Sequence, residues 1–497
     1  MPELDRPSDL FDREEQWRDL SALTLSSTPG LRLAIVSGRR RHGKSYVLRR
    51  LAAATGGLYH QARELEKAQA LAQFATDVAD HLDLDPGSLS FPDWETALRT
   101  ALGMPRRGRA LGAAQLLVID ELPYLLGHSP ELPSVLQLLY DEAQDTPDAP
   151  PRTVVVCGSA LSVMVDLLSG TQPLRGRAQL DLAMPPFDFR QAREYWQIED
   201  PLVAFHLDAI LGGTPGYRSL VSGPPPDDPA RFEDWVAAEL LNPSRALFGE
   251  RSYLLREDPR IVDKALYNSV LRAVAGGARS TSAIGTVVGR DANQLRHPLG
   301  VLESAGFLVK VEDVLTRRRP TYFLADPVVR FGEVVVEPHR TLLEERDAAG
   351  AWAAAAAAYS SQVLGPHFEH LARTWTAGYA GDRFGAPVGV VGPAVLTDDQ
   401  SRSKHELAVV ALDRRSARHS SSARIAVLGE AKSTHRRRSV ADVVRLEAIR
   451  ATLVRRGHDA ADAHVAVFSR TGFDPRLVEL ASTRPDLHLL DLPALYT

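Results

Sequence analysis

Leu31–Arg50, LRLAIVSGRRRHGKSYVLRR, is the stretch that decides the fold of this chain. Its first six residues are mostly apolar and predict a buried strand, and the apolar spacing after Ser45 predicts a helix. Between them, GRRRHGKS fits the phosphate-binding pattern G-x-x-x-x-G-K-[ST] in the strand, loop and helix order that supports it. The sequence therefore predicts an α/β fold with a P-loop NTPase core.

Each residue type in this loop has a role in holding phosphate. The glycines let successive backbone N–H groups turn toward the phosphates, and the N-terminus of the following helix adds free donors and a favourable dipole. Lys44 is expected to reach the β- and γ-phosphates of ATP, and the Ser45 hydroxyl is the expected Mg²⁺ ligand. The predicted nucleotide contacts in the loop are Gly38, Arg39, Arg40, Arg41, His42, Gly43, Lys44, Ser45 and Tyr46.

A second nucleotide motif follows farther along the chain. Gln115–Asp120, QLLVID, is a short apolar run, and two acids, Asp120 and Glu121, end it. In α/β sheets, ligands bind at the carboxyl ends of the strands. We therefore expect Asp120 to hold Mg²⁺, directly or through water, and Glu121 to orient and polarise the attacking water.

Two further loops carry candidate catalytic side chains. Thr153–Val156 predicts the next strand, and Ser159 behind it is a candidate γ-phosphate sensor, although a helix N-cap explains the same serine. Arg177, in the loop PLRGR, is a candidate arginine finger, and the alternative is a solvated loop. Gln191–Leu211 predicts a helical segment that ends at Gly212–Tyr217, where a small lid over the nucleotide fits.

Composition bounds the class of protein. The 497 residues exceed one hydrophobic core, so several domains are expected. The formal net charge of −5 excludes a uniformly basic coat but not a local basic face. The single cysteine, Cys157, excludes an intrachain disulfide and fits a reducing cytoplasm. No apolar run is long enough to span a bilayer, and the acidic N-terminus is unlike a signal peptide. We therefore expect a cytoplasmic protein with no membrane partner.

Together these motifs resemble those of the archaeal-type AAA ATPases, which are close to the signal-transducing STAND ATPases. The resemblance implies that the Gly-Arg pair of the family falls on Gly176–Arg177, that Pro215 lies near adenine, and that Phe11–Glu15 is an entry segment near the base. Arg175 stands where a tyrosine is usual. Family members often carry a winged helix and then a restriction-endonuclease-like domain. The motifs that carry the resemblance are FDRE at 11–14, GRRRHGKS, LLVIDE, Cys157–Ser159, PLRGR and GGTPGY.

The segment after the lid predicts three helices and a hairpin, the element order of a winged helix. The third predicted helix, Ala292–Ala305, contains Asn293, Gln294, Arg296 and His297, which could contact bases or phosphates. Between Arg256 and Glu333 there are 12 basic and 9 acidic residues, so a packing or protein-contact role remains an alternative to nucleic-acid binding. The predicted elements are Ile261–Ala275, Ser280–Val288, Ala292–Ala305, a strand after Gly306, a turn with Arg317–Arg319, and Thr321–Leu324.

The last segment resembles the PD-(D/E)xK nuclease core, in which an Asp and a Glu hold Mg²⁺ and a Lys positions water. Glu430 and Lys432 match that pattern, and Glu369 lies on the preceding predicted helix. The position of the Asp falls on Ala408, so one metal-ligand carboxylate is missing. Glu406 shares a face with Ala408 but would lie roughly 6–7 Å farther along the strand. We therefore expect a degraded site that does not cut DNA.

These observations predict a Mg²⁺-dependent, ATP-binding and ATP-hydrolysing switch that acts on or near nucleic acid. Two alternatives are an ATP-regulated DNA nuclease and a DNA-binding regulator whose ATPase controls assembly. ATP and Mg²⁺ are the expected ligands; DNA, a second copy of the chain and an unidentified protein are further candidate partners. The predicted segments are an AAA-type ATPase core at 1–190, a helical lid and linker at 191–255, a winged helix at 256–335, an Ala-rich helical connector at 336–363 and a restriction-endonuclease-like domain at 364–497.

Overall fold

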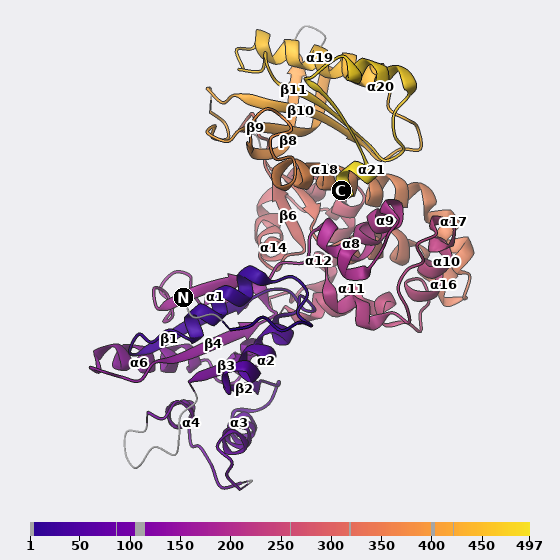
Figure 1. Ribbon diagram of the computed structural model, residues 1–497. Coiled ribbons are helices and arrows are strands. Elements are labelled where there is room, and N and C mark those ends of the chain that lie inside the picture. Colours follow the sequence, from indigo (N-terminus) through magenta and orange to yellow (C-terminus); the bar gives the residue numbers. More distant parts are fainter. Residues whose placement is uncertain are drawn as a thin grey trace. The chain divides into compact units, whose positions relative to one another are not determined.

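The computed structural model describes residues 4–85, 87–104, 115–258, 260–317, 320–398, 403–420 and 422–497 (Figure 1). The chain divides into two compact units, which is a coarser division than the five predicted segments. Unit 1 contains Met1–Pro186, Thr214–Gly216 and Leu254–Val262, and unit 2 contains Phe187–Gly213, Tyr217–Tyr253 and Asp263–Thr497.

Unit 1 is an α/β structure built on a parallel five-stranded sheet with the order β2-β3-β4-β1-β5. Its strands are β1 (Leu31–Ser37), β2 (Leu58–Gln61), β3 (Leu116–Asp120), β4 (Arg152–Gly158) and β5 (Ala178–Ala183). Its helices are α1 (Glu14–Thr24), α2 (Lys44–Thr55), α3 (Lys67–His81), α4 (Trp94–Ala101), α5 (Leu122–Leu126), α6 (Leu132–Asp145) and α7 (Leu161–Asp166).

The apolar runs of the sequence become central strands that are buried on both faces. In β1, Leu33 and Ile35 belong to a core with α3, α4, α5, α6 and α7. The alternate residues Ala34 and Val36 belong to a second core with α1 and α2. Successive side chains of a strand point to opposite faces, so a strand between two helical layers needs apolar residues on both faces.

Strand order places the binding edge of this sheet. The chain leaves β1 toward β2 and leaves β4 toward β5, in opposite directions, and β1 and β4 are neighbours. In open parallel sheets, ligands bind outside the carboxyl ends of the strands at such a reversal. The phosphate-binding loop follows β1 and Ser159 follows β4, so both predicted segments lie at this edge.

The segment after α2 contains a short strand that its residue spacing does not reveal. Apolar residues recur at helical spacing over Gln61–Leu84, but β2 ends at Gln61 and α3 begins only at Lys67. Leu58 and His60 are buried, and β2 pairs with β3 at the edge of the sheet. A four-residue strand is too short to show a clear period of two, so helical spacing dominates the sequence signal.

Unit 2 begins with helices and contains a small antiparallel hairpin. α12, α13 and α14 precede the hairpin β6-β7, in which Leu308 pairs with Leu324. Arg318 and Arg319, at the predicted wing tip, lie outside the described residues. The elements are α8 (Phe189–Trp196), α9 (Pro201–Leu211), α10 (Pro229–Glu239), α11 (Ala246–Glu257), α12 (Lys264–Ala275), α13 (Thr281–Val288), α14 (Ala292–Ser304), β6 (Leu308–Val311), β7 (Thr321–Leu324) and α15 (Pro327–Phe331).

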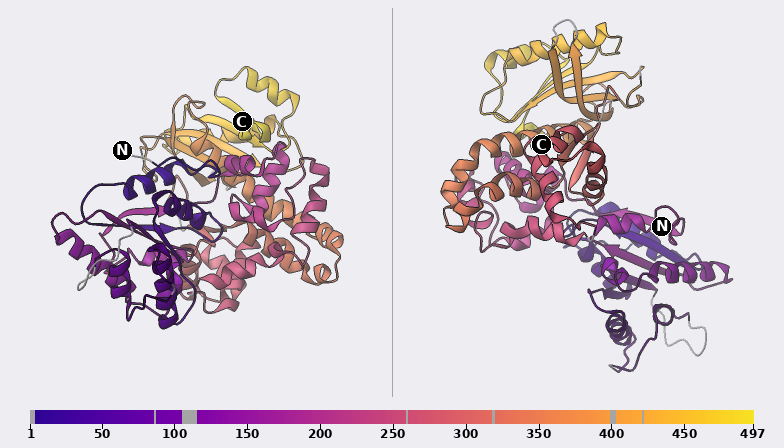
Figure 2. Two further views of the ribbon diagram at one scale, coloured as in Figure 1. Left: turned by 60° about the horizontal axis from the view of Figure 1, so that its bottom comes forward. Right: turned by 180° about the vertical axis from the view of Figure 1, so that it is seen from behind.

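A mixed five-stranded sheet forms the C-terminal part of unit 2, with the order β12-β11-β10-β9-β8. α19 and α20 cover one face, and α18 packs on β8, β9 and β10 (Figure 2). β10, β11 and β12 are mutually parallel, whereas β8 and β9 run antiparallel to their neighbours. The elements are α18 (Gly365–Gly378), β8 (Val388–Asp398), β9 (Ser403–Asp413), β10 (Ile425–Lys432), α19 (Val440–Arg455), β11 (His464–Ser469), α20 (Pro475–Ser482), β12 (Leu487–Asp491) and α21 (Leu492–Tyr496).

Helical structure continues across the predicted boundary between residues 363 and 364. α17 (Ala348–Ala358) passes into a π-helix, η4 (Tyr359–Leu364), and then into α18 without a break. Gly365 and Pro366 do not stop the helix, since both lie in the first turn of α18 directly after the π-helical turn. The connector and the last predicted domain therefore share one helical run.

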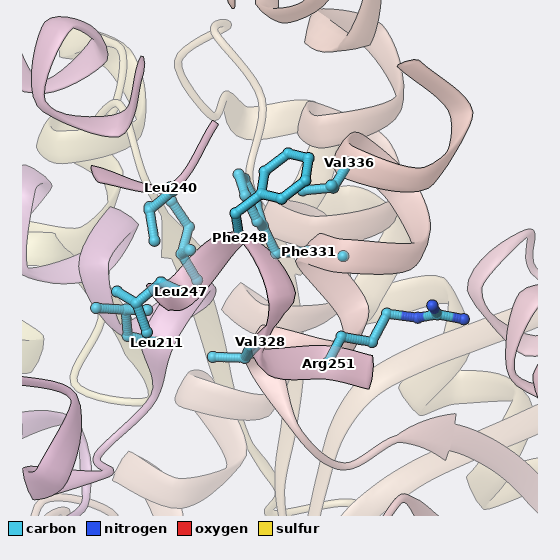
Figure 3. Close-up of a pocket in the computed structure, with 10 residues that line it drawn as sticks. Leu211, Leu240, Leu247, Phe248, Arg251, Val328, Phe331 and Val336 are labelled. Atoms are coloured by element: carbon cyan, nitrogen blue, oxygen red, sulfur yellow. The ribbon is translucent and has the colours of Figure 1, made fainter. Parts of the chain in front are cut away.

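A buried ion pair joins α11 to the π-helix η2 (Gly332–Val336) inside unit 2. Arg251 Nε donates to Glu333 Oε1 at 2.7 Å, and Arg251 NH2 donates to Asn268 Oδ1 at 3.0 Å. The apolar cavity beside it has a volume of about 10 Å³, and Figure 3 shows the guanidinium directed away from its apolar wall. That volume holds about one water, so this cavity is a packing gap and not a ligand site.

Candidate functional site

The phosphate-binding loop lies between Ser37, the last residue of β1, and Lys44, the first residue of α2. Gly43 has φ +90°, a conformation that favours glycine. A Cβ on Gly38 would lie 2.6 Å from the Met184 carbonyl oxygen, so only glycine fits where the loop passes β5. Lys44 is 4% exposed, and its Nζ donates to the Arg39 carbonyl at 3.0 Å. The lysine is therefore held over the loop that it is predicted to serve.

The GGTPGY segment joins unit 1 beside this loop. Gly216 N donates to the Arg41 carbonyl at 3.0 Å, and a Cβ on Gly216 would lie 2.6 Å from Arg41 Cβ. The Pro215 ring is 3.9 Å from the position of a Cβ on Gly43. The structure therefore brings Pro215 next to the phosphate-binding loop, although the two are far apart in sequence.

The N-terminal entry segment is fastened to the same loop and to α2. Arg13 NH2 donates to the Pro185 carbonyl at 2.6 Å and to the His42 carbonyl at 3.4 Å. The Tyr46 hydroxyl donates to Asp9 Oδ2 at 3.0 Å, and the Arg50 guanidinium lies over the Tyr46 ring. These contacts place Asp9 and Arg13 beside the loop and α2, and the position of the entry segment near the base stays a prediction.

The two acids stand at the carboxyl end of β3. Asp120 is fully buried and accepts hydrogen bonds from the Tyr59 hydroxyl and from the Glu121 backbone N–H, the latter at 3.0 Å. Burial, and then the Asp120 charge, raise the pKa of Tyr59, while Arg49 and the nearby Ser45 side chain act against that rise. Tyr59 thus stays neutral and lies beside both predicted Mg²⁺ ligands.

Sequence reasoning missed Tyr59. It lies on β2, whose Leu58 pairs with Leu117 of β3, so the hydroxyl reaches the end of the next strand. The sequence does contain a signal for this strand. Gly56 and Gly57 can end the preceding helix, and the short run Leu58–His60 follows them directly.

Glu121 and the candidate sensor are hydrogen-bonded to each other. Glu121 Oε2 accepts from the Ser159 hydroxyl at 2.9 Å and from the Ser159 backbone N–H at 3.2 Å. Glu121 itself has φ +57°, an uncommon conformation for a residue other than glycine, and such conformations concentrate at functional sites. The ends of β3 and β4 are thereby connected through one carboxylate.

The two acids at the end of β3 are not part of an ion pair with a basic side chain among the described residues. Cys157, in β4, is fully buried, and burial followed by the Asp120 charge raises the pKa of its thiol. The cysteine therefore stays protonated and adds no negative charge beside the two acids.

Arg177 lies at the other edge of the sheet. Its Nε and NH2 donate to Asp141 Oδ1 and Oδ2 at 2.7 and 2.9 Å. The next residue, Ala178, pairs with Leu33 near the start of β1, whereas the phosphate-binding loop follows the end of β1. The structure does not bring Arg177 to the phosphate-binding loop of its own chain, because parallel strands put the start of β5 beside the start of β1.

The nuclease-like residues gather around β10 in unit 2, with a different electrostatic balance. Glu430 is 2% exposed, and its Oε1 forms ion pairs with Lys432 Nζ at 2.9 Å and Arg445 NH1 at 3.0 Å. Gly429 pairs with Val409, which puts Ala408 on the strand adjoining Glu430. Arg373 donates to the Ala408 carbonyl at 2.9 Å. Arginine and lysine side chains thus surround the position where a metal-binding carboxylate would stand.

The remaining carboxylates do not complete a metal site. Burial raises the pKa of Glu369, against the opposing effects of Arg373 and Lys432, and the Glu406 carboxylate pairs with Lys404 at 2.9 Å. Within the described parts of both units, no group of three or more His, Cys, Asp or Glu side chains is arranged to hold a metal ion.

The third helix of the helix-hairpin segment, α14, has an exposed polar side. Asp291 caps it by accepting from the backbone N–H groups of Asn293 and Gln294, and the Gln294 side-chain oxygen accepts from the Asp291 backbone N–H at 3.2 Å. Arg296 and His297 are exposed. Gln294 therefore has a structural role in the capping box, while Asn293, Arg296 and His297 remain the candidate contact residues.

None of the helices in the described ranges has the length and apolar character needed to cross a membrane.

Comparison with known proteins gives distant resemblances. No protein-family model matches the chain. An uncharacterised protein of Methanocaldococcus jannaschii is 22% identical over 341 residues, which cover 67% of this chain and 70% of that protein. Among solved structures, the Walker-type ATPase of Pyrococcus abyssi is 21% identical with a TM-score of 0.47, and the match covers 67% of this chain and 98% of that chain.

The chain is also similar to the ORC2 protein of Aeropyrum pernix, solved as ADPNP–ADP complexes. That match has 16% identity and a TM-score of 0.38, and it covers 69% of this chain and 96% of that chain. At these identities and scores, the side chains of the sites described above remain the basis for assigning function.

Proposed function

We propose that unit 1 binds ATP together with Mg²⁺ and hydrolyses it to ADP and phosphate. The observation that carries this proposal is the Glu121–Ser159 hydrogen bond at 2.9 Å, at the same sheet edge as the phosphate-binding loop. It joins a carboxylate able to hold water to a hydroxyl able to contact phosphate. Among the described residues, no lysine or arginine forms an ion pair with Glu121, so its carboxylate is open to accept a hydrogen bond from water as well as from Ser159.

The loop supplies the binding energy for the triphosphate in this proposal. Lys44 now donates to the neutral Arg39 carbonyl, and a phosphate oxygen is a stronger acceptor because charge-assisted hydrogen bonds are roughly twice as strong as neutral ones. The first turn of α2 offers backbone N–H groups and the positive end of its dipole. Pro215, beside Gly43, would then line the nucleotide site on the side of the GGTPGY segment.

Mg²⁺ fits the donor set at the end of β3. Ser45 and Asp120 both lie beside Tyr59 and offer a hydroxyl and a carboxylate oxygen, which are the hard ligands that magnesium prefers. Magnesium usually keeps several waters and takes few protein ligands beside substrate phosphates. When bound, the ion would neutralise phosphate charge, while Tyr59 would hold the Asp120 carboxylate in its orientation.

Glu121 and Ser159, at the carboxyl ends of β3 and β4, have different roles in this proposal. Glu121 would accept a hydrogen bond from the water that attacks the γ-phosphorus, as the bond to the bridging oxygen breaks and ADP leaves. Ser159, held by Glu121 through both its hydroxyl and its N–H, would report whether the γ-phosphate is present. Loss of the γ-phosphate would change the hydrogen-bond partners available to Glu121 and Ser159.

Two substitutions separate binding from hydrolysis and test the proposal. Lys44→Ala should abolish detectable binding of a fluorescent ATP analogue, while the control Lys67→Ala, a lysine on α3, should bind as the wild type does. Glu121→Gln should bind ATP normally and hydrolyse it at least about 100-fold more slowly, the lower end of the effect of a general base. Normal hydrolysis by a folded Lys44→Ala or Glu121→Gln protein contradicts the assigned site.

We further propose that the ATP cycle acts as a switch through the segment Leu254–Val262. α7 begins two residues after Ser159, and its Ser162 hydroxyl donates to Asp258 Oδ2 at 2.6 Å. Arg260 NH1 pairs with Asp166 Oδ2 at 3.3 Å. Because this segment continues directly into α12 of unit 2, a change at Ser159 has a short covalent route to unit 2.

The partner that we propose for this switch is duplex DNA, bound by unit 2 without cleavage. The exposed Asn293, Arg296 and His297 on α14 support a winged-helix contact, and the ion-paired Glu430 supports loss of nuclease chemistry. A gel shift over a range of salt concentrations, with and without ATP, tests binding, because phosphate contacts make affinity salt-dependent. Asp258→Ala should keep ATP hydrolysis but lose any effect of ATP on the shift. Failure of the chain to shift DNA contradicts this second proposal only.

A further inference from the structure

A second concave site lies within unit 2, apart from the residues assigned above. It has a volume of about 360 Å³, which falls in the range of roughly 300–1,000 Å³ typical of small-molecule sites. Its walls come from α9, α10, α17, the π-helix η4, and the loops that follow β10 and β11. π-helical turns are rare and are frequent at functional sites, and here one supplies Tyr359 and Ser360 to the pocket.

One wall of this pocket is aromatic and uncharged. The rings of Trp352 and Tyr359 are 4.8 Å apart between centroids, and those of His206 and Phe232 are 5.6 Å apart. His206 Nδ1 and the Tyr359 hydroxyl form a 3.0 Å hydrogen bond that joins the two pairs. Burial, together with nearby Arg470, lowers the pKa of His206 to about 3, so its ring stays neutral at physiological pH. Four rings thus line a surface suited to a planar aromatic group.

The opposite end of the pocket is cationic. His435 follows β10 and Arg470 follows β11, and these strands are parallel neighbours, so both residues stand at their carboxyl ends. Arg470 NH2 approaches His435 Nδ1 at 3.2 Å, and the Thr471 hydroxyl donates to the Thr434 carbonyl at 3.2 Å, which joins the two loops. Ligands of α/β sheets bind at this kind of edge.

A buried donor at this end lacks an acceptor. Among the described residues, nothing accepts a hydrogen bond from Arg470 Nε, although the atom is buried. Leaving a buried donor unsatisfied is costly, more so for a charged group. An anion in the pocket would satisfy it, with geometry that a guanidinium offers to a carboxylate or a phosphate. The unsatisfied Nε is thus an observation that points to a ligand, independent of the pocket's shape.

Glu233 limits the charge that this ligand can carry. It is the carboxylate among the lining residues and comes from α10, as do Pro229 and Phe232. A second negative charge on the ligand would be disfavoured by the Glu233 charge on the pocket wall, whereas a single anionic group can be paired by Arg470. We propose that this pocket binds a small planar aromatic acid, with its ring against Tyr359 and Trp352 and its carboxylate at Arg470.

The test uses the full chain carrying Lys44→Ala, so that the phosphate-binding loop does not contribute. Indole-3-acetate is the probe, and binding is followed by calorimetry. We expect saturable binding, at least about tenfold tighter than that of the neutral analogue indole-3-ethanol, because a charge-assisted hydrogen bond is lost. Acetate, which lacks the ring, and phenyl phosphate, which carries a second charge, should both bind at least tenfold more weakly.

Variants assign the binding to this pocket. Arg470→Ala should weaken indole-3-acetate about tenfold and leave indole-3-ethanol unchanged, and Arg476→Ala, an exposed arginine on α20, serves as the matched control. His435→Ala, at an exposed position, should give a smaller loss and covers the case in which Arg470→Ala fails to fold. Equal affinity for indole-3-acetate and indole-3-ethanol, or no effect of either pocket variant, overturns the proposal. Tighter binding of phenyl phosphate overturns the assignment to a carboxylate.

Discussion

Two carboxylate sites, one at each five-stranded sheet, differ in what surrounds the acids. In unit 1, Asp120 and Glu121 accept hydrogen bonds from neutral donors, namely the Tyr59 hydroxyl, Ser159 and a backbone N–H. In unit 2, Glu430 is held by two cations, Lys432 and Arg445. Neutral donors orient a carboxylate and leave its charge available, whereas cations consume that charge.

This difference bears on the Mg²⁺ site that we propose at Asp120. A metal ion at Glu430 would have to displace the Arg445 and Lys432 side chains. Each displaced side chain would then have to move into solvent or be repelled by the metal ion. At Asp120 the ion would meet no resident cation among the described residues. The lack of a carboxylate at position 408 and the pairing of Arg445 with Glu430 therefore both disfavour a metal ion at this site.

The largest expected effect is on ATP hydrolysis when the same substitution is made at the two sheets. Glu121→Gln should lower the hydrolysis rate at least about 100-fold, because an amide cannot polarise water as a carboxylate does. Glu430→Gln should leave the rate unchanged. Phosphate release, measured at saturating ATP and Mg²⁺, compares the two proteins. A comparable loss in both variants would break the contrast between the sites.

For the free energy of unfolding we expect the opposite order, with the larger loss in Glu430→Gln and the smaller in Glu121→Gln. Glu430→Gln leaves Lys432 and Arg445 without a counter-charge, and since both are about two-fifths exposed we expect a loss of about 1–2 kcal/mol, below the cost of breaking a fully buried pair. Glu121→Gln keeps a hydrogen-bond acceptor for Ser159 and should cost less than about 0.5 kcal/mol. Urea unfolding midpoints with unchanged slopes give both values.

Restoring the missing acid sharpens the comparison further. Ala408→Asp alone should not produce measurable Mn²⁺ binding or DNA nicking, because Arg445 and Lys432 still pair with Glu430. Ala408→Asp combined with Arg445→Ala should bind Mn²⁺ weakly, with an affinity of about 1 mM, the order of weak extracellular calcium sites. Calorimetry measures binding and relaxation of supercoiled plasmid measures nicking. Nicking by the wild type that disappears in Glu430→Ala would show that the site is not degraded.

The smallest effect is expected for Arg177 acting within its own chain. Because the guanidinium pairs with Asp141 at the far edge of the sheet, Arg177→Ala in dilute protein should change the hydrolysis rate by less than about threefold, well under 1 kcal/mol. ADP affinity should not change. If Arg177 serves the nucleotide of a second copy, mixing Arg177→Ala with Lys44→Ala protein should raise the activity above that of either protein alone. A large loss in dilute Arg177→Ala would place the arginine at its own nucleotide.

The sequence by itself determined the parts of the protein that local spacing encodes. Gly38, Gly43, Lys44 and Ser45 fix the strand, loop and helix around the phosphate-binding loop, because turn chemistry and apolar period act over a few residues. The apolar run ending in Asp120 and Glu121 predicts a strand with two acids at its end, and that strand is β3. The absence of an acid at Ala408 is also visible in the sequence alone.

Only the tertiary structure decided which of these residues meet. The order of the strands puts Ser159 within hydrogen-bond distance of Glu121. The short strand β2 brings the Tyr59 hydroxyl to Asp120. The parallel register of β5 leaves Arg177 at the opposite edge of the sheet. The pocket of His206, Tyr359 and Arg470 is likewise assembled from distant segments of the chain. The physical reason is that strand neighbours and helix contacts are selected by burial of whole apolar faces, a long-range property that the spacing within any one segment does not contain.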